Sequence, residues 1–555
     1  MLPAWSDYLD AMTWNLADLF ESVVDVVGER VALVVPNAHD GRREFTFAEM
    51  DERVTRLAHV LADHGVGPGD KVGIYGYNSN EWVEAEWAAW KLRAVPVNVN
   101  YRYVEGELRY LFDNADLVAL VHGAEFSPRI AAVRADCPTL TTCVAYDDGS
   151  DQDISVCDGI DYESALAVAS PERDFAPRSD DDLYILYTGG TTGLPKGVMW
   201  RHEDFFKAAL GPILAAMTEP IARPEEVAER AAVSAPGVGF PVAPLMHGAA
   251  QWTSITNSLG GTKMVLSASR RMDPLEVWRI AADEKSMIMN LVGDAQIRPL
   301  VEALAGHEDE FDLSSLFLIS SGGAILSPAV KERLAEALPN VFVYDALGAS
   351  ETGYQGASAG ADSHGRPRFV FGDHTIVIDD DGNPTTPGDG TVGRLVRRGN
   401  IPLGYYKDEK KTAETFPTIN GERWVVPGDM AVAEADGSIT LLGRGSVSIN
   451  SGGEKIFPEE VELVLKGHPE VYDAVVVGVP DERWGERVVA VVVTRGGTRP
   501  TVRDVHDYAS SSIAAFKLPK ELCFVDEMVR SPSGKADYRW AKAQAIAQAE
   551  AQAAD

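Results

Sequence analysis

Two hydrophobic periodicities alternate along the first part of the chain. Thr46 and Glu49 have the spacing of a helix capping box, and apolar residues then recur at helical spacing until Gly65. Short apolar runs, of the length of buried strands, separate such helical segments. Strands are predicted at 72–75, 95–99 and 117–121, and further helices at 82–90 and 104–114. This alternation favours an α/β fold with a largely parallel sheet that helices cover.

Length and composition indicate a globular protein of at least two domains. The chain has 555 residues, whereas a domain commonly spans roughly 100–200 residues. Its 84 acidic and 50 basic residues give a net charge of −34. This charge argues against nucleic acid as a partner, because nucleic-acid phosphates require a positive protein surface. A smaller anionic ligand would need cations or backbone donors concentrated around it.

Cysteine spacing and the N-terminal sequence predict a cytoplasmic protein. The four cysteines form no CxxC pair, so neither a zinc site nor a disulfide framework is expected. Residues 1–14 carry acidic side chains where a signal peptide is positive, and no apolar run approaches the ~18 residues of a membrane span. Peripheral membrane contact and homo-oligomerisation stay open. The Ala- and Gln-rich stretch from Ala541 has little apolar periodicity and predicts a frayed helix or tail.

A glycine- and threonine-rich segment, 187–197, follows the apolar run 183–186. Glycine lets backbone N–H groups turn toward an anion, threonine hydroxyls add donors, and Lys196 adds a positive charge. The segment therefore predicts a phosphate-binding loop. It is not a Walker A loop, because Pro195 precedes the lysine and Gly197 replaces the Ser or Thr that would hold magnesium.

This segment resembles the signature loop of the adenylate-forming superfamily, which includes acyl-CoA synthetases, luciferases and peptide-synthetase adenylation domains. Members attack the α-phosphate of ATP. The resemblance covers essentially the whole chain, because further motifs follow in the family's order at 244–248, 320–324, 347–351, 427–429, 443–458 and 531–535. It implies a large N-terminal domain of parallel-sheet α/β layers with a small β region (1–445), and a small mobile α+β C-terminal domain (446–555).

The resemblance also implies roles for individual residues. ATP or AMP would be bound by Thr188, Gly189, Gly190, Thr191, Thr192, Gly193, Lys196, Gly322, Gly323, Ala324, Ser350, Asp429 and Arg444. The catalytic residues would be Lys535, Thr188, Glu351 and His247, with Glu351 also holding Mg²⁺. The acyl pocket would contain His247, Gly248 and Ala249, and the hinge and the CoA step would use Ser446, Gly452 and Gly453.

Two positions depart from the family pattern. Leu347 stands where relatives commonly place an aromatic residue that stacks on adenine, and Ser446-Val447 replaces the usual charged pair at the hinge. These departures leave open a nucleotide-binding relative that has lost turnover. A fatty acyl-AMP ligase that loads a carrier protein also stays open, whereas a peptide-synthetase-like adenylation module is disfavoured, because a pocket polar enough for an amino group is not evident.

The reaction implied by the resemblance has two steps, with ATP, Mg²⁺ and coenzyme A. A carboxylate attacks the α-phosphate to give acyl-AMP, and the CoA thiol then attacks the acyl carbonyl after the C-terminal domain has rotated. Several local segments, among them 97–114 and 443–462, resemble the actinobacterial ligases that activate carboxylated sterol side chains. We therefore expect a hydrophobic small-molecule acid as substrate, a long-chain fatty acid or a sterol side-chain acid. The segment 210–238 is expected to carry specificity.

Overall fold

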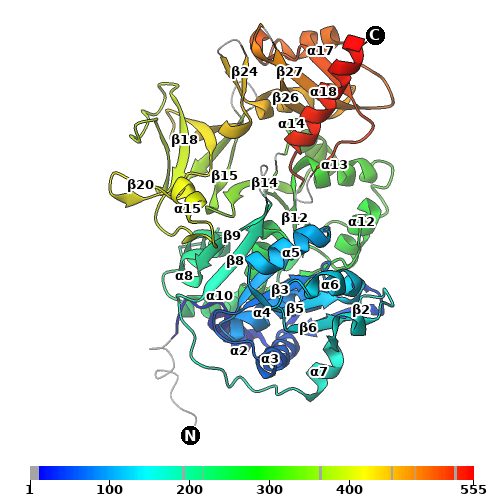
Figure 1. Ribbon diagram of the computed structural model, residues 1–555, viewed down its shortest axis with the longest axis vertical. Coiled ribbons are helices and arrows are strands. Elements are labelled where there is room, and N and C mark those ends of the chain that lie inside the picture. The colour runs from blue at the N-terminus through cyan, green and yellow to red at the C-terminus, as the bar shows by residue number, and fades with distance from the viewer. Residues whose placement is uncertain are drawn as a thin grey trace.

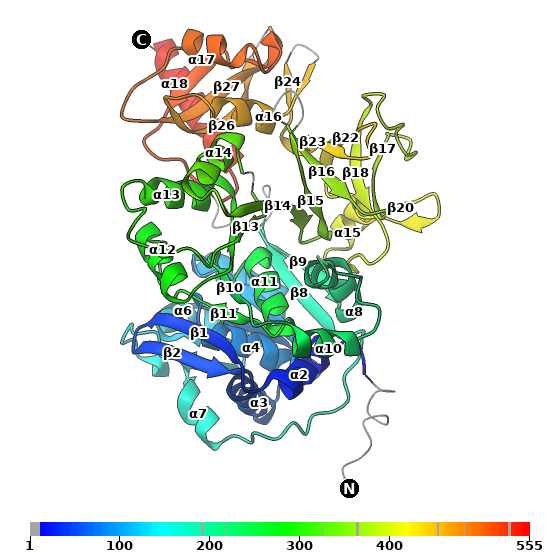
Figure 2. The ribbon, with the colours of Figure 1, turned by 180° about the vertical axis from the view of Figure 1, so that it is seen from behind.

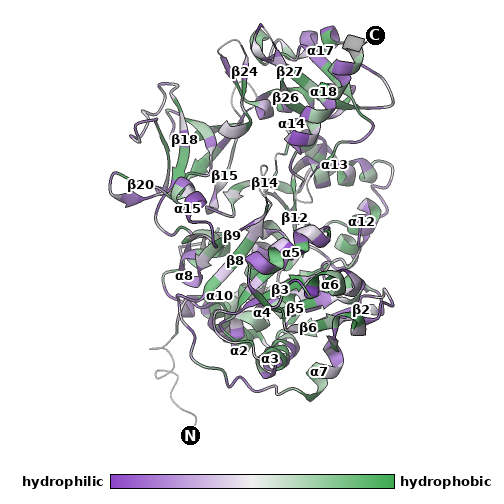
Figure 3. Ribbon diagram, in the orientation of Figure 1, coloured by the Kyte–Doolittle hydropathy of each residue, from purple (hydrophilic) through white to green (hydrophobic). Residues whose placement is uncertain are grey.

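The computed structural model describes residues 12–189, 194–216, 218–324, 326–361, 366–451, 454–481, 483–530 and 534–554. Sheets of eight, thirteen and five strands dominate this part of the chain, with helices packed around them (Figure 1). Hydrophobic residues concentrate on the strands, whereas many loops and outer helix faces are hydrophilic (Figure 3). None of the helices in these ranges has the length and apolarity needed to cross a bilayer.

The eight-stranded sheet confirms the elements predicted from periodicity. Its parallel core contains β3 (Lys71–Tyr75), β4 (Val95–Val99) and β5 (Leu117–Gly123). The predicted helices are α3 (Phe47–Asp63), α4 (Asn80–Lys91) and α5 (Glu105–Asn114). Both hydrogen bonds of the capping box are present at the start of α3. One edge of the sheet is antiparallel and consists of β8 (Leu183–Thr188), β9 (Lys196–Arg201) and β19 (Gly404–Tyr405).

The thirteen-stranded sheet changes from parallel to antiparallel within one strand, β14 (Phe342–Ala349). The first half of β14 pairs in parallel with β13 (Leu318–Ser321), and its second half pairs antiparallel with β15 (Gly353–Ala361). Beyond β15 the sheet continues through β16 (Pro367–Phe371) and antiparallel strands to β17 (Thr375–Ile378). The small β region therefore extends the parallel sheet, and the turn after β14 lies where the two regions meet.

The C-terminal part of the chain has its own five-stranded sheet. Its centre is the long antiparallel pair of β26 (Val471–Asp481) and β27 (Gly485–Thr494), rich in buried valines. Both views of the ribbon place this sheet at the end of the molecule opposite the N-terminus, next to α13 (Gly293–Leu304) and α14 (Pro328–Ala337) (Figures 1 and 2).

The expectation of a frayed helix or tail from Ala541 is wrong for its first turns. Helix α18 (Tyr538–Ala554) packs on the C-terminal sheet, with Ala541 and Ala545 fully buried in a cluster with β26 and β27. Small alanine side chains allow the helix to approach the sheet closely, so a weakly amphipathic sequence still docks.

Candidate active site

The phosphate-binding loop connects two antiparallel strands. Thr188 at the end of β8 and Lys196 at the start of β9 are directly opposite each other in the ladder. Both ends of the loop are therefore fixed by the sheet, and Gly189 follows β8 as an exposed residue outside the strand. The predicted ligands Gly190, Thr191, Thr192 and Gly193 lie outside the described residues.

Asn98 of β4 connects this loop to the segment before His247. Its side-chain amide donates to the carbonyl oxygens of Tyr187, at 2.8 Å, and Met246, at 2.7 Å, and its oxygen accepts from the Tyr187 N–H at 2.8 Å. Asn98 is only 8 % exposed, so these bonds form away from water. The sequence analysis missed this residue. The sequence feature that could have indicated it is a single polar amide within the otherwise apolar strand 95–99.

His247 precedes α11 (Gly248–Leu259), and its imidazole is neutral near physiological pH. Burial lowers the pKa of His247 to about 4, assisted by the positive charges of Lys535 and Arg102. Within the described ranges its Nε2 atom has no hydrogen-bond partner. A buried polar atom without a partner is costly unless a ligand or water supplies one.

Gly248, the residue after His247, packs closely against the neighbouring strand β8. A Cβ atom at position 248 would lie 2.7 Å from Leu186 Cδ2, so glycine is needed there for close packing of α11 on β8. This contact does not test whether Gly248 lines the acyl pocket, and that role stays a prediction. Ala249 is only partly buried, and its place in the acyl pocket stays a prediction.

The turn that carries Ser350 and Glu351 is held by the neighbouring sheet. Trp200 of β9 donates its indole N–H to the Ser350 carbonyl oxygen at 2.9 Å, and Tyr405 of β19 donates its hydroxyl to Glu351 Oε1 at 2.9 Å. These two bonds tie the turn to the strands next to the phosphate loop. Trp200 and Tyr405 were not identified from the sequence.

Lys196 has a partner that was not predicted. Its ammonium group forms an ion pair with Asp408 and lies 5.6 Å from the centre of the Tyr405 ring. The pKa of Asp408 is lowered, mainly by the hydrogen bond that its carboxylate accepts from Lys196. A phosphate that binds Lys196 would therefore compete with this carboxylate.

The small-residue turn after β13 is open above its glycines. Gly323 has a φ of +81°, and a Cβ atom there would meet no atom within 4 Å; at Gly322 it would meet only the Ala346 carbonyl oxygen, at 3.7 Å. Ala324 is partly buried against the main core. Leu347, the departure from the family pattern, packs on an apolar cluster of the small β region.

Asp429 and Arg444 face each other across two strands. They pair in register between β22 (Asp429–Ala433) and β23 (Ile439–Arg444), and Asp429 Oδ1 lies 3.3 Å from Arg444 Nε. The charge of Asp429 is the main cause that raises the pKa of Arg444, with contributions from Glu351 and Glu459. Glu459 also accepts a hydrogen bond from the Arg444 backbone N–H at 3.2 Å.

Lys535 reaches this group of residues from the C-terminal domain. Lys535 is exposed by its surface area, yet enough protein surrounds its ammonium group to desolvate it in part. Burial lowers the pKa of the Lys535 ammonium, as does the charge of Arg444, while Glu351 and Asp429 oppose the shift. The structure thus brings Lys535 into electrostatic contact with Arg444, Glu351, Asp429 and His247.

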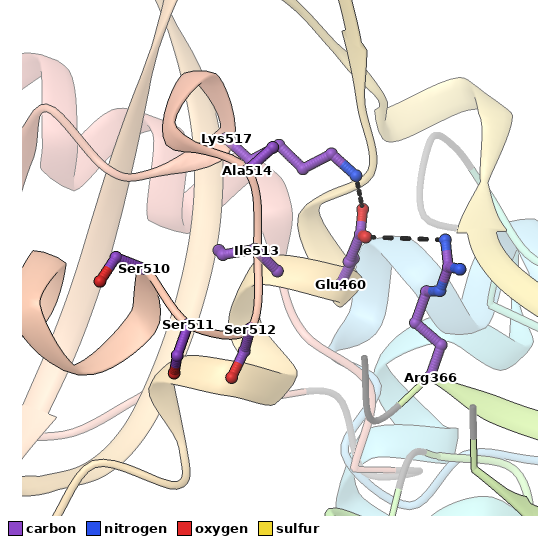
Figure 4. Close-up of a pocket in the computed structure, with 8 residues that line it drawn as sticks. All are labelled: Arg366, Glu460, Ser510, Ser511, Ser512, Ile513, Ala514 and Lys517. Atoms are coloured by element: carbon purple, nitrogen blue, oxygen red, sulfur yellow. Dashed lines mark hydrogen bonds and ion pairs between the residues drawn. The ribbon is translucent and has the colours of Figure 1, made fainter. Parts of the chain in front are cut away.

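Of the predicted hinge residues, only Ser446 lies within the described ranges, two residues after Arg444. Ser446 is in a short turn, η4 (Gly445–Val447), between β23 and β24 (Ile449–Ser451), and Gly452 and Gly453 lie outside the described residues. A cavity of about 390 Å³ lies where the domains meet, and Glu460 points there toward Lys517 and Arg366 (Figure 4). None of the predicted site residues that the structure describes lines it.

Comparison with known proteins assigns the family. The model of the AMP-binding enzyme family matches residues 20–406, and that of the AMP-binding enzyme C-terminal domain matches residues 460–535. This chain belongs to the AMP-binding enzyme family. The resemblance inferred from the motifs is confirmed. The division between residues 445 and 446 stays a prediction.

Curated relatives of this AMP-binding enzyme align over almost its entire length. The medium/long-chain-fatty-acid–CoA/3-oxocholest-4-en-26-oate–CoA ligase of Mycobacterium marinum is 50 % identical over 541 residues, covering 96 % of this chain and 97 % of the relative. The 3-oxocholest-4-en-26-oate–CoA ligase of Rhodococcus rhodochrous is 51 % identical over 540 residues, covering 96 % of both chains.

Among solved structures, the anthranilate CoA ligase AuaEII in complex with anthranoyl-AMP has a TM-score of 0.81 at 24 % identity and covers 98 % of this chain and 100 % of its own. This similarity confirms the expected fold of a large N-terminal and a smaller C-terminal domain.

Proposed function

We propose that this enzyme, an AMP-forming acyl-CoA ligase, activates medium-chain, long-chain and sterol side-chain carboxylic acids. The observation that carries the proposal is that Lys535 lies within electrostatic range of Glu351, Arg444 and Asp429, residues that lie on separate motifs of the adenylate-forming pattern. The C-terminal domain delivers this lysine to acidic and basic residues of the N-terminal domain. Such a delivered lysine fits a positive charge that only the first half-reaction needs.

In the first half-reaction an oxygen of the substrate carboxylate attacks the α-phosphorus of ATP, and pyrophosphate leaves. Negative charge builds on the phosphoryl oxygens, and preorganised donors and cations lower the barrier most where charge develops. We assign this stabilisation to the Lys535 ammonium, the hydroxyls of Thr188 and Ser350, and the backbone N–H groups of the glycine loop. Lys196 would exchange Asp408 for a phosphate oxygen.

The nucleoside of ATP would be held by residues on two sides of the site. Asp429, an acceptor with two oxygens, suits both ribose hydroxyls, and Arg444 lies within reach of ribose and phosphate. The open turn at Gly322, Gly323 and Ala324 suits a flat base, because no side-chain atom of the described residues would lie within 4 Å of a Cβ atom added at either glycine.

Glu351 fits a shared Mg²⁺ site. In the described ranges no three His, Cys, Asp or Glu residues cluster as a metal site, so the protein itself supplies few ligands. Mg²⁺ is ordinarily held by one or two carboxylates together with substrate phosphates and water. When bound, the ion would neutralise phosphate charge. Tyr405 fixes the carboxylate of Glu351 for this role through its hydrogen bond.

In the second half-reaction the thiol of CoA attacks the acyl carbonyl of acyl-AMP. The new C–S bond forms, the bond to AMP breaks, and the thiol proton is released. We assign this step to a rotated arrangement in which Lys535 has left the cleft and the segment with Gly452 and Gly453 faces the acyl group. Ser446 would be the pivot.

The proposed substrates rest on the full-length relatives. Their names specify medium- and long-chain fatty acids and 3-oxocholest-4-en-26-oate, and they share half of their residues with this chain across both domains. The specificity segment would include residues 210–238.

The test is a panel of acids incubated with ATP, Mg²⁺ and CoA, with AMP, ADP and thioester measured separately. We expect AMP in equal amounts with thioester, no ADP, and faster turnover of dodecanoate, hexadecanoate and 3-oxocholest-4-en-26-oate than of acetate. Stoichiometric ADP would refute the adenylation chemistry. Acyl-AMP without thioester would instead indicate a carrier-protein acceptor.

A further inference from the structure

The loop that carries Lys535 rests directly on the first turn of α13. Gly534, the preceding residue, is buried and has a φ of +72°. A Cβ atom there would lie 3.2 Å from Ala295 Cβ and 3.3 Å from Val292 Cγ1. Even the smallest side chain would therefore push the loop away from the helix, and the position of Lys535 depends on how the C-terminal domain sits on α13.

A tyrosine of the C-terminal sheet meets the same helix further along. The guanidinium carbon of Arg298 lies 5.3 Å from the centre of the Tyr472 ring, and that of Arg495 lies at the same distance. Arg298 is itself fixed by an ion pair with Asp294 at 2.9 Å. Arg495 pairs with Glu302 of α13 at 2.9 Å. The Arg298–Tyr472 contact and the Arg495–Glu302 ion pair therefore join the two domains side by side, and Arg495 also packs on the Tyr472 ring within its own domain.

Tyr472 also adjoins the support of the lysine loop. The pairing of β26 with β27 shifts register between Val471 and Asp473, and such a bulge re-aims a side chain. Asp473 binds Arg530 through both carboxylate oxygens, at 2.7 and 2.8 Å, and Arg530 donates to the Gly534 carbonyl oxygen at 3.0 Å. A continuous series of contacts therefore runs from α13 through residues 472 and 473 to the loop.

The surroundings of Tyr472 indicate that it does more than pack in the hydrophobic core of the C-terminal domain. Its ring is only partly buried, and it belongs to neither apolar cluster of the C-terminal sheet within the described ranges. Burial raises the pKa of its hydroxyl, as does Glu302, so the phenol is neutral at physiological pH. Its specific interactions are those of its face with two arginines.

We propose that Tyr472 is a positioning residue for the adenylation half-reaction. Its contact with Arg298, beside the Arg495–Glu302 ion pair, holds the C-terminal domain on α13 in the orientation that delivers Lys535, and these two contacts separate when the domain turns for the CoA step. The proposal rests on the two-step function above. It predicts that weakening this contact changes the balance between the half-reactions, because the orientation serves only one of them.

The experiment compares Tyr472→Leu and Tyr472→Phe with the wild-type enzyme. Acyl-AMP formation is followed by pyrophosphate release with hexadecanoate and no CoA, and thioester formation is followed separately from supplied hexadecanoyl-AMP and CoA. Leucine removes the aromatic face, whereas phenylalanine keeps it and loses only the hydroxyl. Glu302→Gln weakens the neighbouring ion pair as an independent perturbation of the same interface.

We expect Tyr472→Leu to lower the ratio of the adenylation rate to the thioester rate by about tenfold, the size of a partly desolvated cation–π contact. The loss should appear in kcat for adenylation, because fewer enzyme molecules would hold the productive orientation. KM for ATP and for hexadecanoate should change by less than about twofold. Tyr472→Phe should restore the ratio. Glu302→Gln should shift it in the same direction by about two- to fivefold.

The contrary results are distinct. An unchanged ratio in Tyr472→Leu, or an equal loss of both half-reactions with a wild-type unfolding midpoint, overturns the proposal; a Tyr472→Phe defect as large as that of leucine also overturns it. Thermal unfolding of each variant shows whether an equal loss comes from misfolding. If Tyr472→Leu misfolds, the rate ratio of Glu302→Gln decides whether the interface positions Lys535. If the wild-type enzyme forms neither acyl-AMP nor thioester, the proposed function itself has failed.

Discussion

Replacing Asn98 by aspartate tests how the phosphate loop and the His247 segment are held together. The substitution keeps the shape of the side chain but removes both donors, because an ionised carboxylate only accepts hydrogen bonds. The carbonyl oxygens of Tyr187 and Met246, now at 2.8 and 2.7 Å from the amide nitrogen, would each lose their donor. They would also face a negative charge.

The magnitude follows from the burial of these groups. Each buried acceptor left without a partner costs about 1–3 kcal/mol, so two of them cost about 2–6 kcal/mol. The chain would relieve this by moving the segments apart. Tyr187 adjoins Thr188 and Met246 adjoins His247, so the displacement falls on two proposed active-site residues. A misplacement of about 1 Å can lower a rate about 10²-fold.

We therefore expect Asn98→Asp to lower kcat/KM for acyl-AMP formation by about 10²-fold at neutral pH, measured by ATP–pyrophosphate exchange. Asn340→Asp is the matched control, since it adds the same charge at an exposed turn and should leave the rate unchanged. A variant Asn98→Asp with wild-type exchange and a wild-type unfolding midpoint would refute the positioning argument.

The proposed active-site roles predict separable effects on the two half-reactions and on specificity. Lys535→Ala should lower acyl-AMP formation by about 10²–10³-fold and spare thioester formation from supplied acyl-AMP, and loss of both would contradict the assignment. Gly452→Trp, outside the described residues, should show the opposite pattern in the same two assays. Ala249→Trp should reduce kcat/KM for hexadecanoate far more than for butyrate; equal losses would show that Ala249 only packs. Because the pKa of His247 is about 4, the imidazole stays neutral from about pH 6 to about pH 8, and His247→Gln should leave the shape of the pH–rate profile there unchanged. A wild-type inflection near about pH 6.5 that the variant lacks would contradict this.

The sequence determined what depends on neighbouring residues. The capping box at Thr46, strand 95–99 and the helices between the strands follow from local periodicity, because a helix or strand with one buried face must repeat its apolar residues at a fixed interval. The family motifs likewise lie within short segments, so the order of these segments was sufficient to indicate the adenylate-forming reaction. Length and charge set only outer limits.

The sequence was less informative where a residue depends on distant partners. At Gly248, only the packing of α11 against Leu186 shows that an added Cβ atom would come too close to a neighbouring side chain. Ala541 suggested a tail, because the sheet that receives it lies far away along the chain. Asn98 gave little indication of its role, since its partners are 89 and 148 residues away.

The tertiary structure decided how the site is assembled. It placed Asp408 on Lys196, Tyr405 on Glu351 and Tyr472 between the domains. Each of these contacts joins segments whose separation along the chain carries no periodic pattern. They arise because the order of the strands, and the change of pairing within β14, bring particular strand ends together. The strand order in turn depends on the burial of all the sheets at once.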